Sequence, residues 1–133
     1  MKNFLAYGTL RFNCSNNNKF LKGVPLIKRN VKVEGYKMFS MGEFPYVIPC
    51  KNSFIIGDIF NIDDNIENML DMLEGIEIDF YTKEYTKQDN LLVYVGNERV
   101  MYSVGSPEEV KSGDWIDFKD YQPPYYFAEQ HLL

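Results

Sequence analysis

The strongest structural signal in the chain is an amphipathic helical pattern over residues 64–74. Its apolar positions share the spacing of one helical face and are Ile62, Ile66, Met69, Leu70 and Leu73. Asp63 or Asp64 can cap the start of this helix, and Gly75 stands where it should end. Most of the remaining chain is patterned as strands, so the sequence favours an α+β fold.

The strand-like segments are short and spread along the chain. The expected strands are residues 2–7, 30–34, 36–39, 54–60, 80–85, 91–95 and 98–104. Gly35 marks a bulge between the second and third of these, and Gly96-Asn97 is a two-residue hairpin signal before the last. Residues 41–49 contain two prolines, which favour a loop followed by a short edge strand.

Two shorter helices are also expected. One follows a cap at Ser15 or Asn16, and the other begins at Ser106-Pro107. The tail, residues 115–133, is expected to run over the body in extended form. The sum is a single domain over residues 1–133, built from mostly antiparallel strands with two or three short helices. A closed barrel is one arrangement that these strands allow.

The composition excludes several classes of function. A net charge of −5 does not resemble the basic surface of a nucleic-acid-binding protein, and no apolar run is long enough to span a membrane. Cys14 and Cys50 lie apart in the sequence, and the only histidine is His131, so neither a metal site nor a triad of serine, histidine and aspartate is expected. Two reduced cysteines indicate a cytoplasmic protein.

Acidic residues gather before and within the start of the main helix. They are Asp58, Asp63, Asp64 and Glu67. Their spacing lacks the alternation and the glycine of a calcium-binding loop. We therefore interpret them as a solvated helix N-terminus, where negative charge is favourable.

The segment Tyr7-Gly8-Thr9-Leu10 follows the first strand directly. Glycine allows another group to approach the backbone, and successive N–H groups at such a turn can bind a carboxylate or phosphate. A plain turn from strand to loop explains the same residues, so both interpretations stay open at this point. Arg11, the next residue, is expected to be a surface charge.

Glu74 is the best candidate for acid–base chemistry. It lies in the last turn of the main helix, at the edge of the apolar stripe, whereas Asp71 lies toward solvent. Partial burial and the helix dipole should both raise the pKa of Glu74, as a general base working near neutral pH requires. An exposed glutamate before a glycine cap is the equally weighted alternative.

The chain resembles the γ-glutamylcyclotransferase-like superfamily. The motifs that carry this resemblance are Y-G-T-L at residues 7–10, L-D-x-x-E-G at residues 70–75 followed by Tyr81, Gly35-Tyr36 with residues 44–49, Gly57-Asp58-Ile59-Phe60, and Val93-Tyr94-Val95. The similarity covers about residues 3–104 and is greatest to the γ-glutamylamine cyclotransferase branch. It implies a small mixed β-barrel of about six or seven strands with two or three short flanking helices.

The resemblance also implies an activity. Members of the family convert a γ-glutamyl amide to 5-oxoproline and a free amine by attack of the substrate's own α-amine, without metal or cofactor. The N–H groups of Gly8, Thr9 and Leu10 would then bind the substrate carboxylate. Glu74 would act as the base and afterwards as the acid.

The resemblance also assigns residues around the substrate. Tyr7, Tyr46 and Tyr81 are the candidate pocket residues, although Tyr7 and Tyr46 could equally be core aromatics. The family often has arginine where this chain has Lys83. A lysine keeps the charge and loses the bidentate fork, which matters little if the position only forms a structural pair.

Other functions remain open at this stage. Within the family, the substrate could be a γ-glutamylamine such as a γ-glutamyl-lysine isopeptide, a γ-glutamyl amino acid, glutathione or a γ-glutamyl-protected intermediate. A non-catalytic relative would bind a metabolite or a protein on the same fold, and a barrel without a pocket would be purely structural. A small-molecule partner and a monomer are expected, with a dimer as the alternative.

Overall fold

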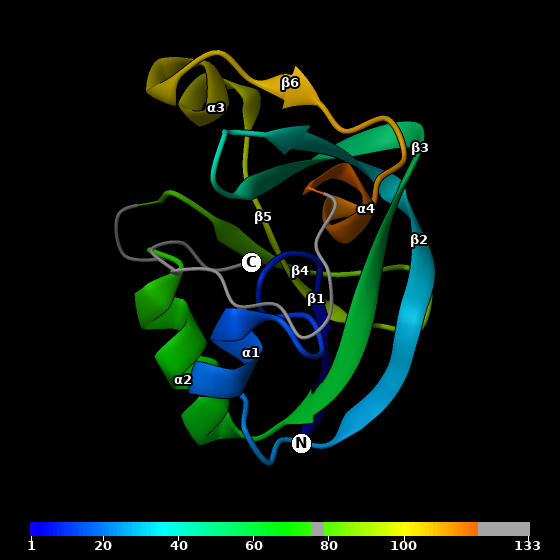
Figure 1. Cartoon of the computed structure of the whole chain (residues 1–133), viewed down its shortest axis with the longest axis vertical. Coiled ribbons are helices and arrows are strands. Elements are labelled where there is room, and N and C mark those ends of the chain that lie inside the picture. The colour runs from blue at the N-terminus through cyan, green and yellow to red at the C-terminus, as the bar shows by residue number, and fades with distance from the viewer. Residues whose placement is uncertain (76–78, 120–133) are drawn as a thin grey trace.

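The computed structural model describes residues 1–75 and 79–119, which form one six-stranded mixed sheet with short helices around it (Figure 1). The elements in chain order are β1 (Lys2–Ala6), α1 (Ser15–Phe20), β2 (Leu26–Ser40), β3 (Pro45–Ile62), α2 (Asp64–Leu73), β4 (Thr82–Tyr85), β5 (Leu92–Val95), α3 (Glu98–Val104), β6 (Glu108–Glu109) and α4 (Trp115–Lys119).

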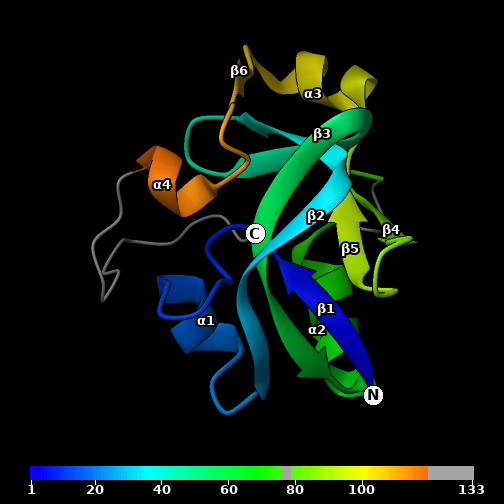
Figure 2. The ribbon, with the colours of Figure 1, turned by 90° about the vertical axis from the view of Figure 1, so that its right-hand side faces the viewer.

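The sheet has the strand order β4-β5-β1-β3-β2-β6. Strands β1 and β5 are parallel, and every other neighbouring pair is antiparallel. The two long strands, β2 and β3, bend along their length, so the sheet curls into a half-barrel (Figures 1 and 2). This architecture confirms the predicted fold class.

The bulge predicted at Gly35 is present. The pairing of β2 with β3 shifts register between Glu34 and Tyr36, and Gly35 has a φ of 97°. Glycine adopts this left-handed conformation without the steric cost that a Cβ brings. On the opposite strand the shift falls after Pro49, so the two strands bend together at this point.

The loop and strand expected at residues 41–49 are present, but the expectation of a short strand was wrong. The strand begins at Pro45 and continues as β3 to Ile62. Residues 45–49 pair with β2 on one side, whereas β1 pairs only with residues 58–62 of β3, so this part of β3 is a local sheet edge, as expected. Pro45 is the first residue of the strand and Pro49 lies at the register shift, and a missing N–H is tolerated at both kinds of position.

Three predictions for the C-terminal part were also wrong. The hairpin return strand expected at residues 98–104 is the helix α3. The helix expected after Ser106-Pro107 is absent, and β6 pairs there with Phe39 and Ser40. The tail begins with the helix α4 instead of an extended segment, and its continuation from residue 120 lies outside the described residues.

The main helix and its caps are confirmed. The side chain of Asp63 accepts a hydrogen bond from the Ile66 N–H at 2.9 Å, and Gly75 has a φ of 68° just beyond the helix. Helix α1 also forms where it was expected, although its N-cap residue is Cys14 and not Ser15 or Asn16. None of the helices in the described ranges is long and apolar enough to cross a membrane.

Arg11 is buried, so the prediction that it is a surface charge was wrong. Its side chain is 1% exposed. The Nη1 atom donates to Asp114 Oδ1 at 2.8 Å, and Nη2 donates to Asn30 Oδ1 at 2.6 Å. The Nε atom lies 3.4 Å from Asp58 Oδ2. The guanidinium therefore joins the loop after β1 to β2, β3 and the start of α4.

Asp58 is fully buried, which corrects the interpretation of the acidic residues as one solvated group. Its carboxylate also accepts N–H bonds from Phe12 and Asn30, each at 2.9 Å. Asp63 and Asp64 are exposed at the helix start, as expected. Within the described residues, no group of acidic, histidine and cysteine side chains could hold a metal ion.

We expect Arg11→Met to lower the free energy of unfolding by about 3–5 kcal/mol, because the buried Asp58 carboxylate then loses its counter-charge. Urea unfolding followed by circular dichroism measures the change. The matched control is Lys28→Met, which removes an exposed lysine of β2 and should change stability by no more than about 0.5 kcal/mol. Equal effects of the two substitutions would contradict a structural role for the Arg11 network.

Candidate active site

Three predicted tyrosines are buried and come from three different strand ends. Tyr7 follows β1, Tyr46 is the second residue of β3, and Tyr81 precedes β4. The rings of Tyr46 and Tyr81 lie 5.1 Å apart, and Phe80 packs against both. The sheet therefore brings Tyr46 and Tyr81 together although they are far apart in the sequence.

Each of these hydroxyl groups is held by the main chain. Tyr7 donates to the Tyr94 carbonyl at 2.6 Å, Tyr46 to the Phe80 carbonyl at 2.8 Å, and Tyr81 to the Pro45 carbonyl at 3.3 Å. Burial raises the pKa of Tyr7 and of Tyr81 well above the ordinary value. These tyrosines therefore stay protonated and can position a ligand, but they cannot act as bases near neutral pH.

Glu74 is more deeply buried than the half-buried position expected from the helical wheel. It is the C-cap residue of α2 and is 3% exposed. Its Oε2 atom has no hydrogen-bond partner in the described part of the chain. Desolvation raises the pKa of Glu74 well above its ordinary value, a shift that is common among carboxyl groups that transfer protons.

Glu74 and the tyrosines occupy one neighbourhood. The carboxylate contributes to the raised pKa values of Tyr7 and Tyr81, after the larger effect of burial on each. It acts in the same way on Tyr94, where burial again comes first. The structure thus assembles Glu74, Tyr7, Tyr46 and Tyr81 around one region. Their roles toward a substrate stay predictions.

The loop from Tyr7 to Leu10 is held in place by helix α1. Asn16 donates to the Thr9 hydroxyl at 2.7 Å, and the Asn17 side chain donates to the Leu10 carbonyl at 3.0 Å. The N–H groups of Gly8 and Leu10 donate to no other residue within the described ranges. Both are buried, so an anionic ligand is a physically reasonable partner for them.

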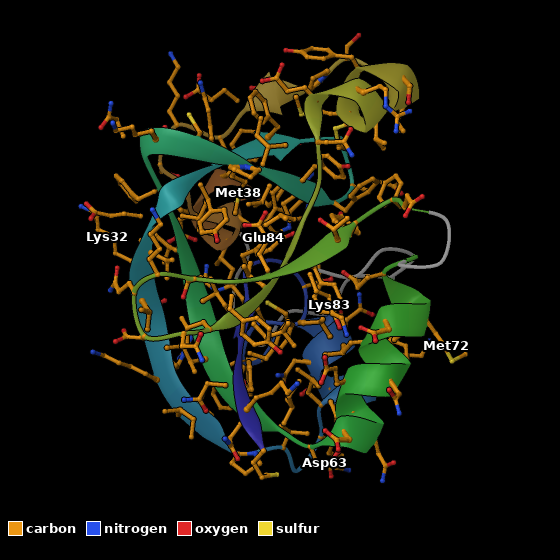
Figure 3. The ribbon with its side chains drawn as sticks, turned by 180° about the vertical axis from the view of Figure 1, so that it is seen from behind. Lys32, Met38, Asp63, Met72, Lys83 and Glu84 are labelled. Carbon is orange, nitrogen blue, oxygen red and sulfur yellow. The ribbon has the colours of Figure 1, made fainter. Side chains whose placement is uncertain are left out.

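Helix α2 is fixed to the sheet by a network of charges in the two turns before Glu74. Tyr94 donates to Asp71 Oδ1 at 2.7 Å, and the Lys83 ammonium donates to Asp71 at 2.9 Å and to Glu67 at 2.8 Å. Lys2 completes the network at 2.7 Å from Glu67. Figure 3 shows Lys83 beside α2. Lys83 therefore forms structural ion pairs with α2. A lysine makes these pairs without the bidentate geometry of an arginine.

Gly96 makes room for Tyr46. A Cβ atom at position 96 would lie 1.9 Å from the Tyr46 ring, and the Asn97 N–H donates to the Tyr46 hydroxyl at 3.2 Å. The Asn97 side chain also caps α3 through the Val100 N–H at 2.9 Å. The sequence did not predict this contact, nor did it predict that Asn16 and Asn17 hold the loop after β1 and that Tyr94 bonds to Asp71. The sequence predicts a hairpin turn at Gly96-Asn97, and this turn pattern gives no indication that the pair contacts Tyr46.

A curled mixed sheet with a glycine loop after its first strand and a buried glutamate ending its main helix defines a recognisable class of small α+β proteins. The family model for "Gamma-glutamyl cyclotransferase, AIG2-like" matches residues 4–117, and the chain belongs to this family. A curated protein of Methanocaldococcus jannaschii named "Putative gamma-glutamylcyclotransferase" is 29% identical over 124 residues, which cover 90% of this chain and 99% of the relative.

Solved structures share the fold. An aig2-like protein from Mus musculus superimposes with a TM-score of 0.69 at 18% identity and covers 98% of this chain and 99% of its own. An uncharacterized protein from Pyrococcus horikoshii gives a TM-score of 0.68 at 20% identity, covering 90% and 93%. These findings confirm the predicted superfamily and fold, while the branch within the family stays a prediction.

We expect Gly96→Ala to displace the Tyr46 ring and to lower the free energy of unfolding by about 1–3 kcal/mol, the usual cost of overpacking. Urea unfolding gives the magnitude, and near-ultraviolet circular dichroism reports the ring environment. Gly105→Ala is the matched control, because a Cβ there meets nothing within 4 Å and the backbone is extended. An unchanged stability of Gly96→Ala would contradict the close packing described above.

The burial of Glu74 predicts a dependence of stability on pH. The unfolded chain releases this proton near the ordinary pKa of about 4.3, whereas the folded chain keeps it to higher pH. Between these two pKa values the native state binds more protons, so its stability falls as the pH rises. Glu74→Gln should therefore gain stability relative to the natural protein between about pH 5 and about pH 8.

Urea unfolding at the two pH values measures this difference. Glu98→Gln, an exposed glutamate at the start of α3, should show no such relative gain. A constant difference between Glu74→Gln and the natural protein across this range would contradict the raised pKa.

Proposed function

We propose that the protein is a γ-glutamylcyclotransferase-type enzyme that converts a γ-glutamyl amine or amide to 5-oxoproline and a free amine. The observation that carries this proposal is the buried Glu74 carboxyl, with an unpartnered oxygen atom and a raised pKa, in a chain of this family. A desolvated carboxyl with a raised pKa is suited to proton transfer.

The substrate would be held at both ends of its glutamyl part. The N–H groups of Gly8 and Leu10, with Thr9 between them, would bind the α-carboxylate at the end of β1. Tyr7, Tyr46 and Tyr81 would form walls around the glutamyl chain. Since their hydroxyl groups are already bonded to main-chain carbonyls, the walls would keep their shape when substrate enters.

Glu74 would move the protons. Its carboxylate takes a proton from the α-ammonium, and the freed amine attacks the γ-carbonyl carbon and forms the new ring C–N bond. The bond from that carbon to the leaving nitrogen then breaks as Glu74 returns a proton to this nitrogen. Over the reaction the α-nitrogen loses two protons and the leaving nitrogen gains two, so Glu74 ends in its starting state.

In this mechanism the protein accelerates the reaction in two ways, by positioning the substrate and by acid–base catalysis. Holding the amine and the carbonyl in attack geometry can contribute about 7–11 kcal/mol. A positioned acid–base group adds about 10²–10⁴-fold. Neither contribution needs a nucleophile from the protein, because the substrate carries its own.

The test is turnover of a panel that contains γ-glutamyl-ε-lysine, a γ-glutamyl amino acid and glutathione, with 5-oxoproline measured by mass spectrometry. We expect at least one compound to react and Glu74→Gln to lower kcat by about 10²–10⁴-fold. Activity should fall on the acidic side as the raised pKa of Glu74 is crossed, because the protonated carboxyl cannot accept the α-ammonium proton.

Glu98→Gln is the control and should keep full activity, since this glutamate is exposed on α3. A panel without turnover would favour the alternative of a non-catalytic binding domain on the same fold. Full activity of Glu74→Gln with an unaltered pH profile would contradict the assigned acid–base role.

A further inference from the structure

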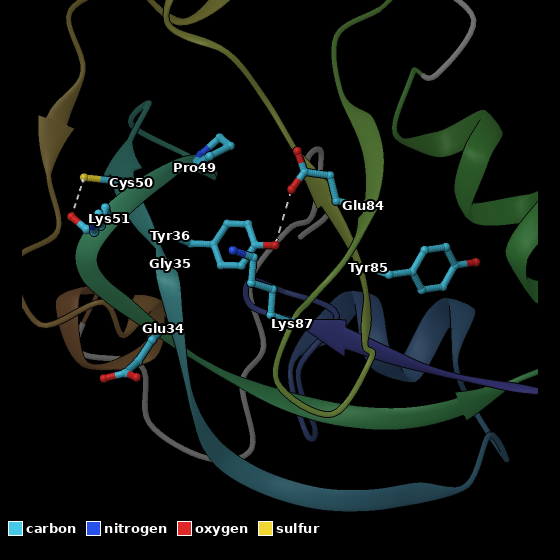
Figure 4. A pocket seen from close by; sticks show the side chains of 9 residues that line it. All are labelled: Glu34, Gly35, Tyr36, Pro49, Cys50, Lys51, Glu84, Tyr85 and Lys87. Carbon is cyan, nitrogen blue, oxygen red and sulfur yellow. Dashed lines mark hydrogen bonds between the residues drawn. The ribbon is translucent and has the colours of Figure 1, made fainter.

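The curl of the sheet leaves a groove between two parts of the chain that do not pair through their backbones. One wall is the bulged middle of β2 and β3, and the other is the end of β4 with the turn that follows it (Figure 4). The groove is open to solvent and has a volume of about 600 Å³, and it is lined by Glu34, Tyr36, Pro49, Lys51, Glu84 and Lys87, among others. A second hollow of about 570 Å³ shares Glu34, Lys51 and Lys87 and continues it past Asn52.

The two walls are joined by side-chain hydrogen bonds. The Tyr36 hydroxyl donates to Glu84 Oε1 at 3.4 Å, and the Gln88 side chain donates to the Lys32 carbonyl at 3.5 Å. Both distances are longer than the normal range, so these two bonds join the walls only weakly. Figure 4 shows the Tyr36 ring at the centre of the groove, with its hydroxyl pointing to Glu84.

Acidic and basic side chains line the groove, and they form no ion pairs with one another. Glu34, Glu84, Lys51 and Lys87 all line it, and none of them forms an ion pair with another residue in the described ranges. The charges on the other face of β4 behave differently, because Lys83 there is paired with carboxylates of α2 at 2.8 and 2.9 Å. The groove therefore offers acidic and basic groups to a ligand, with Glu84 beside Tyr36 and the Glu34 carboxylate directed away from both (Figure 4).

We propose that this groove is a second ligand site, which binds a small zwitterion of the amino-acid or short-peptide class. The ligand ammonium would pair with Glu84, and its carboxylate with Lys87. The Tyr36 ring and Pro49 supply an apolar surface between the charged groups. The volume is within the range of about 300–1,000 Å³ that is usual for small-molecule sites.

The site is separate from the candidate active site and does not rest on the proposed reaction. The groove contains none of Glu74, Tyr7, Tyr46 and Tyr81. It is close to that site along the chain, however, because Pro49 and Glu84 each come three positions after one of the paired tyrosines, Tyr46 and Tyr81. A ligand that draws the two walls together would therefore act on β3 and β4, next to this tyrosine pair.

The experiment is a titration of the ¹⁵N-labelled full chain with triglycine, a zwitterion without a γ-glutamyl group, followed by amide chemical shifts. We expect saturable shifts at the groove, with the amides of Gly35, Lys51 and Lys87 as reporters. Glu84→Gln and Lys87→Met should each weaken binding about tenfold, the effect of losing one charged hydrogen bond.

Three controls test whether the charged side chains of the groove bind the peptide. Lys28→Met removes an exposed lysine outside the groove and should bind triglycine as the natural protein does. Tyr36→Phe keeps every charge and should keep binding. Triglycine with an acetylated amino end and an amidated carboxyl end has no charge and should not bind.

Several outcomes would overturn the proposal. They are the absence of saturable shifts, equal binding of the uncharged peptide, and shifts confined to Gly8 and Leu10, which would place triglycine in the candidate active site instead. Because triglycine is not a γ-glutamyl compound, each outcome is distinguishable from a failure of the proposed cyclotransferase activity. The amide spectrum of each variant also shows directly whether it is folded.

Discussion

The buried contact between Arg11 and Asp58 is the interaction on which the arrangement of the site depends. Two opposite charges removed from water need further hydrogen bonds, and here Asn30 and Asp114 accept from the guanidinium while the Phe12 N–H donates to the carboxylate. The Arg11 Nε atom lies 3.4 Å from Asp58 Oδ2 and forms no hydrogen bond within the described residues. These partners come from β2, from the start of α4 and from the loop after β1. The loop that carries the N–H groups of Gly8 and Leu10 is thereby fixed immediately before the ion pair.

A second group of charged residues fixes the position of the helix that ends at Glu74. Hydrogen bonds from Lys2 and Lys83 hold the pKa of Glu67 below its ordinary value, and Lys83 also bonds Asp71. Helix α2 is thus held to β4 and β5 by contacts outside the site. The unfavourable burial of Glu74 can persist because these independent contacts position the helix end. A desolvated carboxyl maintained in this way is typical of functional sites.

The sequence predicted some elements of the fold correctly and others wrongly, and the difference has a physical reason. Local patterns with one physical meaning gave correct elements, such as the α2 periodicity with its Asp63 cap and the bulge at Gly35. Patterns with two meanings failed. Asparagine suits both a hairpin turn and a helix N-cap, so Gly96-Asn97 predicted a hairpin, whereas Asn97 caps α3 and Gly96 accommodates Tyr46. The interior position of Arg11 left no local signal, because its partners are 19, 47 and 103 residues away.

By itself, the amino-acid sequence determined the α+β class, the helix that ends at Glu74, the glycine loop after the first strand and the family to which these motifs belong. These features are local, since they depend on periodicity, capping and the order of short motifs. Only the tertiary structure decided that Glu74 is buried among tyrosines from separate strand ends, that Arg11 belongs to the interior, and that two acidic and two basic side chains line one groove. Each of these depends on contacts between residues distant in the chain, and hydrophobic periodicity carries no information about which distant side chains will meet.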